Sequence, residues 1–317
     1  MKKTLKSLLF LVLALLVIAF ALAYIPVDSM TNHVSVSEER ATQLRNEFAG
    51  PHHLITTADG QTLFLRRWNP DSVQVGKEHV AVLIFHGITA YSGPYEMAGK
   101  PFSENGYTSF GLDYRGHGLS GGNRGDSPGK DRWIEDLGEA VRYIKGLGFS
   151  EVVIVGHSLG VASAICAANL VPEEISGLVL LSGAYEGKKG VAREPSFLEK
   201  ARFFSGALLR PSYQIYEYYR EGMTVTQDSL FNLHYTPRFL MMLDVKELKL
   251  PTDMNVPVLV GVGDSDELFA VEKVREFYDM IPGGQKEFMV MPNTTHAVIP
   301  LESWMMVVDW LDRTFAK

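Results

Sequence analysis

The chain has 317 residues, of which 46% are hydrophobic, and its 30 Lys and Arg against 37 Asp and Glu give a formal net charge of −7. This balance is typical of a globular protein with a sizeable core, and it excludes collagen-like, disordered and disulfide-stapled chains. The acidic charge argues against a nucleic-acid partner, whose phosphates require clustered Lys and Arg. The single cysteine, Cys166, excludes an intrachain disulfide and a cysteine-rich metal site, so we interpret it as a core residue.

Residues 1–29 form a segment of their own. Three lysines precede an unbroken apolar run from Leu8 to Val27. About 20 apolar residues in a helix can cross a bilayer, and basic residues ahead of them keep the N-terminus inside. We expect a retained inner-membrane anchor, or a signal peptide cleaved at the small residues Ala21-Leu22-Ala23, with a buried core helix as a third reading. Anchor or signal would place the rest of the protein in the cell envelope, outside the cytoplasm, or secreted.

From about residue 52, segments typical of strands alternate with segments typical of helices. The first two expected strands lie within His52–Trp68, on either side of a turn at Asp59-Gly60. The other expected strands are short apolar or β-branched runs: Val80–Phe85, Tyr107–Leu112, Val152–Val155, Leu178–Leu181, Val258–Val262 and Glu287–Met291. The expected helices are Trp133–Leu147, Val161–Leu170, Val271–Ile281 and Leu301–Phe315. This alternation predicts an α/β fold, with a mostly parallel sheet that helices cover on both faces.

The strongest chemical signal is the pentapeptide Gly156-His157-Ser158-Leu159-Gly160. It matches Gly-x-Ser-x-Gly, and it lies between an expected strand and an expected helix, which is the context that a nucleophile elbow requires. A sharp turn from strand to helix strains the serine backbone and leaves no room for side chains at the two glycine positions. The turn also places the hydroxyl at a helix N-terminus, which favours developing negative charge. We therefore predict that Ser158 is a nucleophile.

A serine hydroxyl needs a base, and the base needs an acid that orients it. In this topology the acid and then the base follow the serine along the chain. His296 comes after the last expected strand and is the expected base. The loop after the preceding strand offers three carboxylates. Asp266 is favoured because the turn must complete before the side chain points back across the sheet edge; Asp264 is the second choice and Glu267 the third.

The oxyanion of the transition state needs hydrogen-bond donors. We expect these to be the backbone N–H groups of Leu159, directly after the nucleophile, and of Ile88, in the loop after the strand Val80–Phe85. In the same loop, we interpret His86 as a packing and hydrogen-bonding residue rather than as a second base.

These residues resemble the serine α/β-hydrolases, and within them the monoglyceride lipase and lysophospholipase group. The resemblance covers about residues 50–317. The oxyanion loop is represented by His86-Gly87, Ser92-Gly93 and Tyr95, and an Asp-x-Arg-Gly-His-Gly-x-Ser segment by Asp113–Gly121. The elbow is Gly156–Gly160, the acid turn is Gly263-x-x-Asp266, and the base is His296. The resemblance implies the α/β-hydrolase fold and a Ser-His-Asp site.

The alternation of strands and helices stops between residues 184 and 250. This stretch is rich in aromatic and apolar residues at a spacing that suggests short helices. We expect a cap or lid insertion here, with a hydrolase core made of residues 30–183 and 251–317. An apolar underside of the cap would hold an acyl chain, at roughly 0.8 kcal/mol for each buried methylene; ordinary packing is the alternative role. Four aromatic residues are candidates for contact with the substrate: Phe204, Tyr216, Phe231 and Phe239.

We therefore expect a serine hydrolase that cleaves carboxylic esters through an acyl-enzyme and needs no metal and no organic cofactor. Monoacylglycerol- or lysophospholipid-like lipids are the expected substrates, and the apolar N-terminal segment is the expected contact with a membrane. The sequence does not predict the oligomeric state. A peptidase or amidase with the same triad is the main alternative, and Glu217 or Glu221 would then bind an N-terminal amine. A non-catalytic envelope binding protein is a third reading, although such a protein would normally have lost a triad residue.

Overall fold

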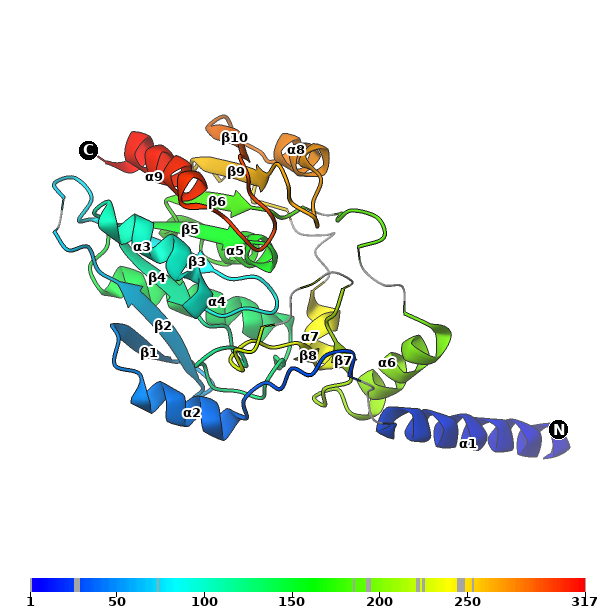
Figure 1. Cartoon of the computed structure of the whole chain (residues 1–317). Helices are drawn as coiled ribbons and strands as arrows, with labels where there is room; N and C mark the ends of the chain where they lie inside the picture. The colour runs from blue at the N-terminus through cyan, green and yellow to red at the C-terminus, as the bar shows by residue number, and fades with distance from the viewer. Residues whose placement is uncertain are drawn as a thin grey trace.

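The computed structural model describes residues 2–25, 29–72, 74–184, 186–191, 195–220, 223, 226–243, 249–252 and 254–316. Within these residues an eight-stranded sheet has the order β1-β2-β4-β3-β5-β6-β9-β10 (Figure 1). Its strands are β1 (His52–Thr56), β2 (Thr62–Trp68), β3 (Val80–Phe85), β4 (Thr108–Leu112), β5 (Glu151–His157), β6 (Gly177–Leu181), β9 (Val258–Gly263) and β10 (Lys286–Met291). The hairpin β1-β2 is antiparallel, β2 is antiparallel to β4, and every other neighbouring pair is parallel.

Helices cover both faces of this sheet. One face carries α3 (Glu96–Glu104) and α9 (Leu301–Phe315), and the other carries α4 (Lys130–Gly146), α5 (Leu159–Leu170) and α8 (Val271–Met280). The alternation of side chains along β3 shows why its sequence is apolar throughout. Val82 packs with the α3 and α9 side, whereas its neighbour Leu83 packs with the α4 and α5 side. The expected α/β-hydrolase architecture is confirmed.

Two helices of the core, α2 (Glu38–Glu47) and α3, lie outside the expected helical segments. The helix α2 buries only Ala41 and starts at Ser37, whose side chain accepts the Arg40 N–H. The helix α3 contains Pro101, which ordinarily breaks a helix. Tertiary contacts nevertheless hold α3 in place, because Gly99 lets its backbone approach the indole ring of Trp68 so closely that a Cβ would overlap the ring.

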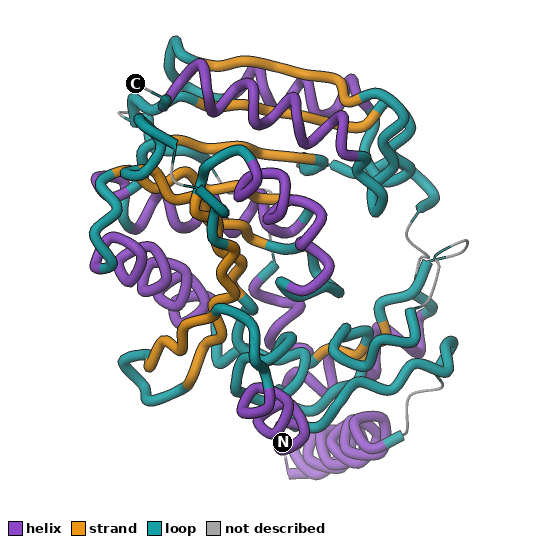
Figure 2. The backbone as a smooth tube through the Cα atoms, turned by 60° about the vertical axis from the view of Figure 1, so that its left-hand side comes forward, coloured by secondary structure: helices purple, strands orange, loops and turns teal. Residues whose placement is uncertain are grey.

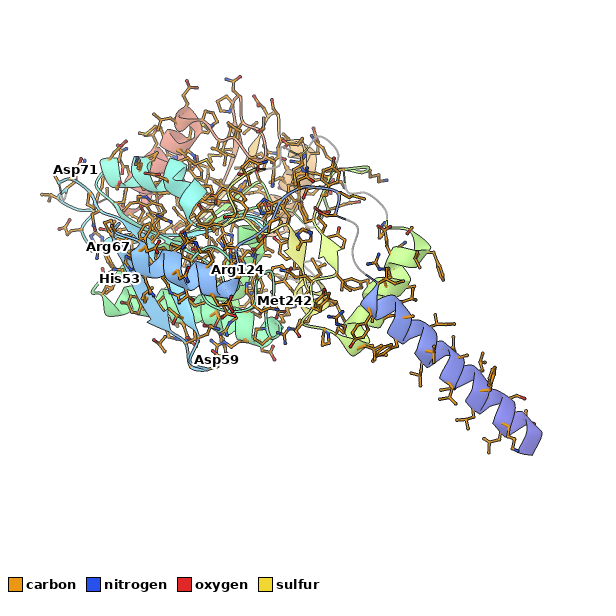
Figure 3. The ribbon with its side chains drawn as sticks, turned by 60° about the horizontal axis from the view of Figure 1, so that its bottom comes forward. His53, Asp59, Arg67, Asp71, Arg124 and Met242 are labelled. Atoms are coloured by element: carbon orange, nitrogen blue, oxygen red, sulfur yellow. The ribbon has the colours of Figure 1, made fainter. Side chains whose placement is uncertain are left out.

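The N-terminal helix α1 (Lys2–Tyr24) projects away from the rest of the protein (Figure 1). Its stretch Thr4–Tyr24 has a mean hydropathy of 2.8 and is long enough to cross a membrane. Most of its side chains extend into open space (Figure 3). A buried core helix, the third reading of this segment, does not fit that exposure. Its C-terminal end contacts α6 (Phe197–Leu209), where the Arg210 guanidinium lies over the Tyr24 ring, 4.3 Å from its centre.

Residues 184–250, which we call the insertion, separate β6 from β9. Their described part contains α6, the short hairpin β7 (Tyr216–Glu217) and β8 (His234–Tyr235), and α7 (Pro237–Met242). A capping box between Ser196 and Glu199 starts α6. The elements of the insertion gather beside the core, between the sheet and α1 (Figure 2).

Candidate active site

The serine of the pentapeptide lies at a sharp turn between β5 and α5. Ser158 has φ of 56° and ψ of −117°, a combination that an L-residue adopts only when its surroundings enforce it. A Cβ at Gly156 would overlap the carbonyl oxygen of Gly160, and a Cβ at Gly160 would overlap that of Phe85. Both glycines are therefore required by the close approach of β5, α5 and β3.

His296 lies between Ser158 and Asp266. Its Nε2 is 3.0 Å from the Ser158 Oγ, and its Nδ1 is 3.2 Å from the Asp266 Oδ2. The second carboxylate oxygen of Asp266 accepts the N–H groups of Leu268, at 2.8 Å, and Phe269, at 2.9 Å. The three side chains that were expected from the sequence thus form one hydrogen-bonded chain, although they are far apart in sequence and follow three different strands.

The Asp266 carboxylate is held in its ionised form. It is only 1% exposed, and burial alone would raise its pKa. The hydrogen bond and the charge interaction with His296, together with the Phe269 N–H, outweigh burial and leave the pKa below its ordinary value of 3.8. A charged carboxylate at this position stabilises positive charge on the imidazole and keeps a proton on Nδ1.

The two neighbouring carboxylates have different partners. Asp264 is exposed and accepts the backbone N–H groups of Asn293, at 3.0 Å, and Thr294, at 3.3 Å. Glu267 accepts the backbone N–H of His296 at 2.9 Å and pairs with Arg220 of the insertion at 2.8 Å. Both therefore shape the loop that carries His296. Sequence analysis considered Glu267 only as an acid and did not find Arg220, because a contact from the insertion leaves no local signal.

The loop after β3 is tied to the elbow through Tyr95. The Gly87 N–H donates to the Tyr95 hydroxyl at 2.9 Å, and that hydroxyl is 2.6 Å from the Nδ1 of His157. Burial, with the nearby His296, lowers the pKa of His157 to about 3, so its ring is neutral and its Nδ1 can accept the hydroxyl proton. This arrangement fixes Gly87 beside Ser158.

The two expected oxyanion donors belong to α5 and to the loop after β3. Leu159 is the first residue of α5 and follows Ser158 directly. Ile88 lines the same cavity as Ser158, and its carbonyl accepts the Tyr235 hydroxyl at 2.7 Å. That hydrogen bond holds the Ile88–Thr89 peptide group from the side of the insertion.

Ser158 and His296 open into a cavity of about 280 Å³. Its walls come from the loop after β3 and from the insertion, and most of them are apolar. They include Ile88, Met97, Tyr218, Phe231 and Leu233. Arg220 also reaches the wall, whereas no Asp or Glu occurs among the residues described there.

The four aromatic candidates do not share this cavity. Phe231 lines it. Phe204 and Tyr216 instead line a second cavity of about 580 Å³, beside α6 and next to Met30. Phe239 is 1% exposed, stacks on Tyr235 with ring centres 5.0 Å apart, and lines neither of these two cavities.

Other candidate sites give little. In the part of the chain that the structure describes, no group of three or more His, Cys, Asp or Glu side chains is arranged to hold a metal ion. His86 is fully buried, and burial lowers its pKa well below 6.5, with its Nδ1 at 2.8 Å from the Gly87 carbonyl. Glu217 lies outside the Ser158 cavity, and Glu221 is not among the described residues.

Comparison with known proteins places these features in a family. The family model described as serine aminopeptidase, S33, matches residues 76–303. The uncharacterized protein YnbC of Escherichia coli is 26% identical over 262 residues, which are 79% of this chain but only 44% of YnbC. The monoacylglycerol lipase of Mycolicibacterium smegmatis is 23% identical over 81% of this chain and 94% of its own length. The chain thus spans less than half of the first relative and nearly all of the other.

A solved structure gives the same fold. A soluble variant of monoglyceride lipase from Saccharomyces cerevisiae, in complex with a substrate analogue, superimposes with a TM-score of 0.65 at 19% identity, over 92% of this chain and 99% of that one. The family match includes the elbow, the acid turn and His296, and it covers more than half of the chain. The chain therefore belongs to the serine aminopeptidase S33 family of α/β-hydrolases, in its monoglyceride lipase-like group.

Proposed function

We propose that this protein is a serine esterase that hydrolyses carboxylic esters of the monoacylglycerol or lysophospholipid kind. The observation that carries the proposal is the hydrogen-bonded chain from Ser158 through His296 to Asp266, which ends in a largely apolar cavity. Nucleophile, base and acid within hydrogen-bonding distance of one another are the arrangement that acyl transfer through a serine requires.

The proposed reaction uses this geometry. The Ser158 Oγ attacks the ester carbonyl carbon while the His296 Nε2 takes the hydroxyl proton, and Asp266 stabilises the resulting imidazolium. The N–H groups of Leu159 and Ile88 donate to the oxyanion of the tetrahedral intermediate. Its collapse expels the alcohol, which receives the proton from His296. Water then attacks the acyl-enzyme with the same base, and the acid product leaves.

The substrate class rests on the cavity and on the relatives. An ester with a short apolar chain matches walls such as Phe231 and Leu233, because burial of methylene groups is favourable. We assign residues 30–183 and 251–317 to the hydrolase core and 184–250 to a cap over Ser158. The names of the mycobacterial and yeast relatives, a monoacylglycerol lipase and a monoglyceride lipase, support the same class.

We also propose that residues 1–29 attach the protein to the inner membrane, with the hydrolase in the envelope, or are removed as a signal. The exposed apolar surface of α1 supports a lipid environment for this helix. An immunoblot of membrane and soluble fractions distinguishes the two outcomes, since cleavage near Ala23 shortens the protein and releases it from the membrane. An uncleaved protein in the soluble fraction would contradict both.

The family description favours a second candidate, an aminopeptidase with the same triad. Such an enzyme needs a carboxylate that binds the N-terminal amine of its substrate. Arg220 lines the Ser158 cavity, and Glu221, the next residue and a candidate for that role, lies outside the described residues. Turnover of aminoacyl-naphthylamides at a higher kcat/KM than p-nitrophenyl esters would establish the peptidase instead.

The decisive experiment compares Ser158→Ala with Ser163→Ala in the full-length protein in detergent. Ser163 is a buried serine one turn further along α5, so it is a matched control. We expect the wild type and Ser163→Ala to hydrolyse p-nitrophenyl esters and to be labelled by a fluorophosphonate. We expect Ser158→Ala to lose both and to unfold at the same temperature. Ester turnover by Ser158→Ala at the wild-type rate would refute the proposed function.

A further inference from the structure

The chain that follows α1 is built into the insertion. Residues 29–36, which we call the strap, run from the end of α1 across the insertion towards α2. At the beginning of the strap, the Glu217 carboxylate accepts the Ser29 hydroxyl and the Thr31 N–H, each at 3.1 Å, and also the Met30 N–H and the Thr31 hydroxyl. The Glu217 side chain is only 3% exposed. These bonds attach the start of the strap to β7.

The middle of the strap contacts a second part of the insertion. His33 is 6% exposed, and its ring lies between two carbonyl oxygens, with Nδ1 at 3.1 Å from that of Thr226 and Nε2 at 2.9 Å from that of Phe231. The Ser35 hydroxyl donates to the same Phe231 carbonyl at 2.8 Å. The Val36 N–H donates to the Ser229 carbonyl at 2.9 Å. One face of segment 226–231 is therefore held by the strap.

The opposite face of that segment meets the loop that carries Ile88. The Tyr91 hydroxyl donates to Asp228 at 2.7 Å, and the Asn232 N–H donates to the Thr89 carbonyl at 3.0 Å. The rings of Tyr91 and Phe231 meet edge to face, with their centres 5.6 Å apart. Segment 226–231 thus lies between the strap and the oxyanion loop, and Thr226 and Phe231 line the cavity of Ser158.

We infer that His33 is a positioning residue for the substrate cavity, which acts by holding the backbone of Thr226 and Phe231 against the oxyanion loop. This inference rests on the proposed esterase function. A neutral imidazole has one N–H to donate, and the Phe231 carbonyl also accepts the Ser35 hydroxyl. Without the ring, the carbonyl groups of Thr226 and Phe231 lose this shared donor and a packed neighbour, and the segment is expected to shift until a new donor is reached. The shift moves Phe231 and leaves Ser158, His296 and Asp266 where they are. Substrates that fill the cavity are therefore affected more than substrates that reach only the serine.

The test compares His33→Ala with Val34→Ala in the full-length protein in detergent. Val34 is the next residue of the strap and is 77% exposed, so it controls for a change in the strap that makes no contact with the cavity wall. We expect His33→Ala to raise KM for p-nitrophenyl octanoate about tenfold, the equivalent of about 1.4 kcal/mol. We expect its kcat on p-nitrophenyl acetate to stay within about twofold of wild type, Val34→Ala to match wild type, and His33→Gln, which retains a donor, to be intermediate.

An unchanged KM for the octanoate in His33→Ala would overturn the inference, and so would an equal loss of kcat on both esters, which a merely structural role predicts. If His33→Ala does not fold, Ser35→Ala removes one donor to the Phe231 carbonyl and is expected to raise the same KM about twofold to threefold; no change there would also overturn it. A wild type that hydrolyses neither ester and resists fluorophosphonate would instead refute the proposed function. A wild type that is active and equal to His33→Ala refutes only the role of His33.

Discussion

The substitution Asp266→Asn tests the acid assignment because the structure fixes how an asparagine must lie. One carboxylate oxygen of Asp266 accepts the N–H groups of Leu268 and Phe269, and the other faces the His296 Nδ1. Asparagine has one carbonyl oxygen, and the two N–H donors require it on their side. Its amide NH₂ then faces the His296 Nδ1. The ring is forced to accept there and to carry its proton on Nε2.

A proton on Nε2 points at Ser158 and removes the base. We expect kcat to fall on the order of 10⁴-fold, as an acid-to-amide change does in other serine hydrolases of this mechanism. At about 1.36 kcal/mol for each factor of ten, the transition state loses roughly 5.4 kcal/mol. The fold is preserved because the bonds to Leu268 and Phe269 remain. The thermal unfolding midpoint should therefore change far less than the rate.

The matched control is Asp264→Asn, two residues earlier in the same loop. Asp264 gives one oxygen to Asn293 and the other to Thr294, so the amide loses one hydrogen bond, worth about 1 kcal/mol of stability. We expect its kcat on p-nitrophenyl butyrate to remain within about threefold of wild type. The assignment is refuted if Asp266→Asn keeps more than a tenth of the wild-type kcat, or if Asp264→Asn is the more damaging change.

Three further predictions use the same site. Gly160→Ala forces a Cβ onto the Phe85 carbonyl, so it should lower the free energy of unfolding by about 1–3 kcal/mol in urea titrations and reduce fluorophosphonate labelling; a wild-type labelling rate would contradict this. Tyr95→Phe leaves Gly87 and His157 without the hydroxyl, which should cost about 1–3 kcal/mol of stability and lower kcat on p-nitrophenyl acetate; an unchanged kcat would argue against a link to the oxyanion loop. The lowered pKa of Asp266 means that its ionised form stabilises the fold above its unfolded value of 3.8, and that this contribution is lost as pH falls through the lower folded value. The difference in unfolding free energy between wild type and Asp266→Asn should therefore shrink as the pH falls from 5 to below 4; a difference that grows over this range would contradict the sign.

The core could be predicted from the sequence because its signals are local. A run such as Val80–Phe85 is apolar at every position, which is what burial on both faces of a parallel sheet requires. The elbow is equally local, since two glycines, a serine, a strand and a helix adjoin one another along the chain. The choice of Asp266 over Asp264 also followed from chain geometry. Asp264, at the start of the turn, binds the neighbouring loop, whereas Asp266, two residues later, faces the His296 ring.

The cavity walls could not be predicted in this way. Phe204, Tyr216 and Phe231 are similar residues in one aromatic stretch, yet only Phe231 reaches the Ser158 cavity. Phe204 lies in α6, Tyr216 in β7 and Phe231 in the loop before β8, and the two-residue strands β7 and β8 leave almost no periodicity in the sequence. His33 is a clearer case, because nothing around it in the chain indicates that its ring would meet the carbonyl groups of Thr226 and Phe231.

The position of the strap bears on whether the N-terminal segment is retained. Cleavage after Ala23 would remove most of α1, along with the Ala23 carbonyl near Arg210, at 3.4 Å, and it would leave Ser29 to Val36 in the mature chain. The bonds of the strap to Glu217 and to segment 226–231 use only residues beyond that point. An anchored and a released form would therefore share the same cavity wall, because its support begins after the cleavage site. Attachment to the membrane can then change where the esterase acts while the shape of its substrate cavity stays the same.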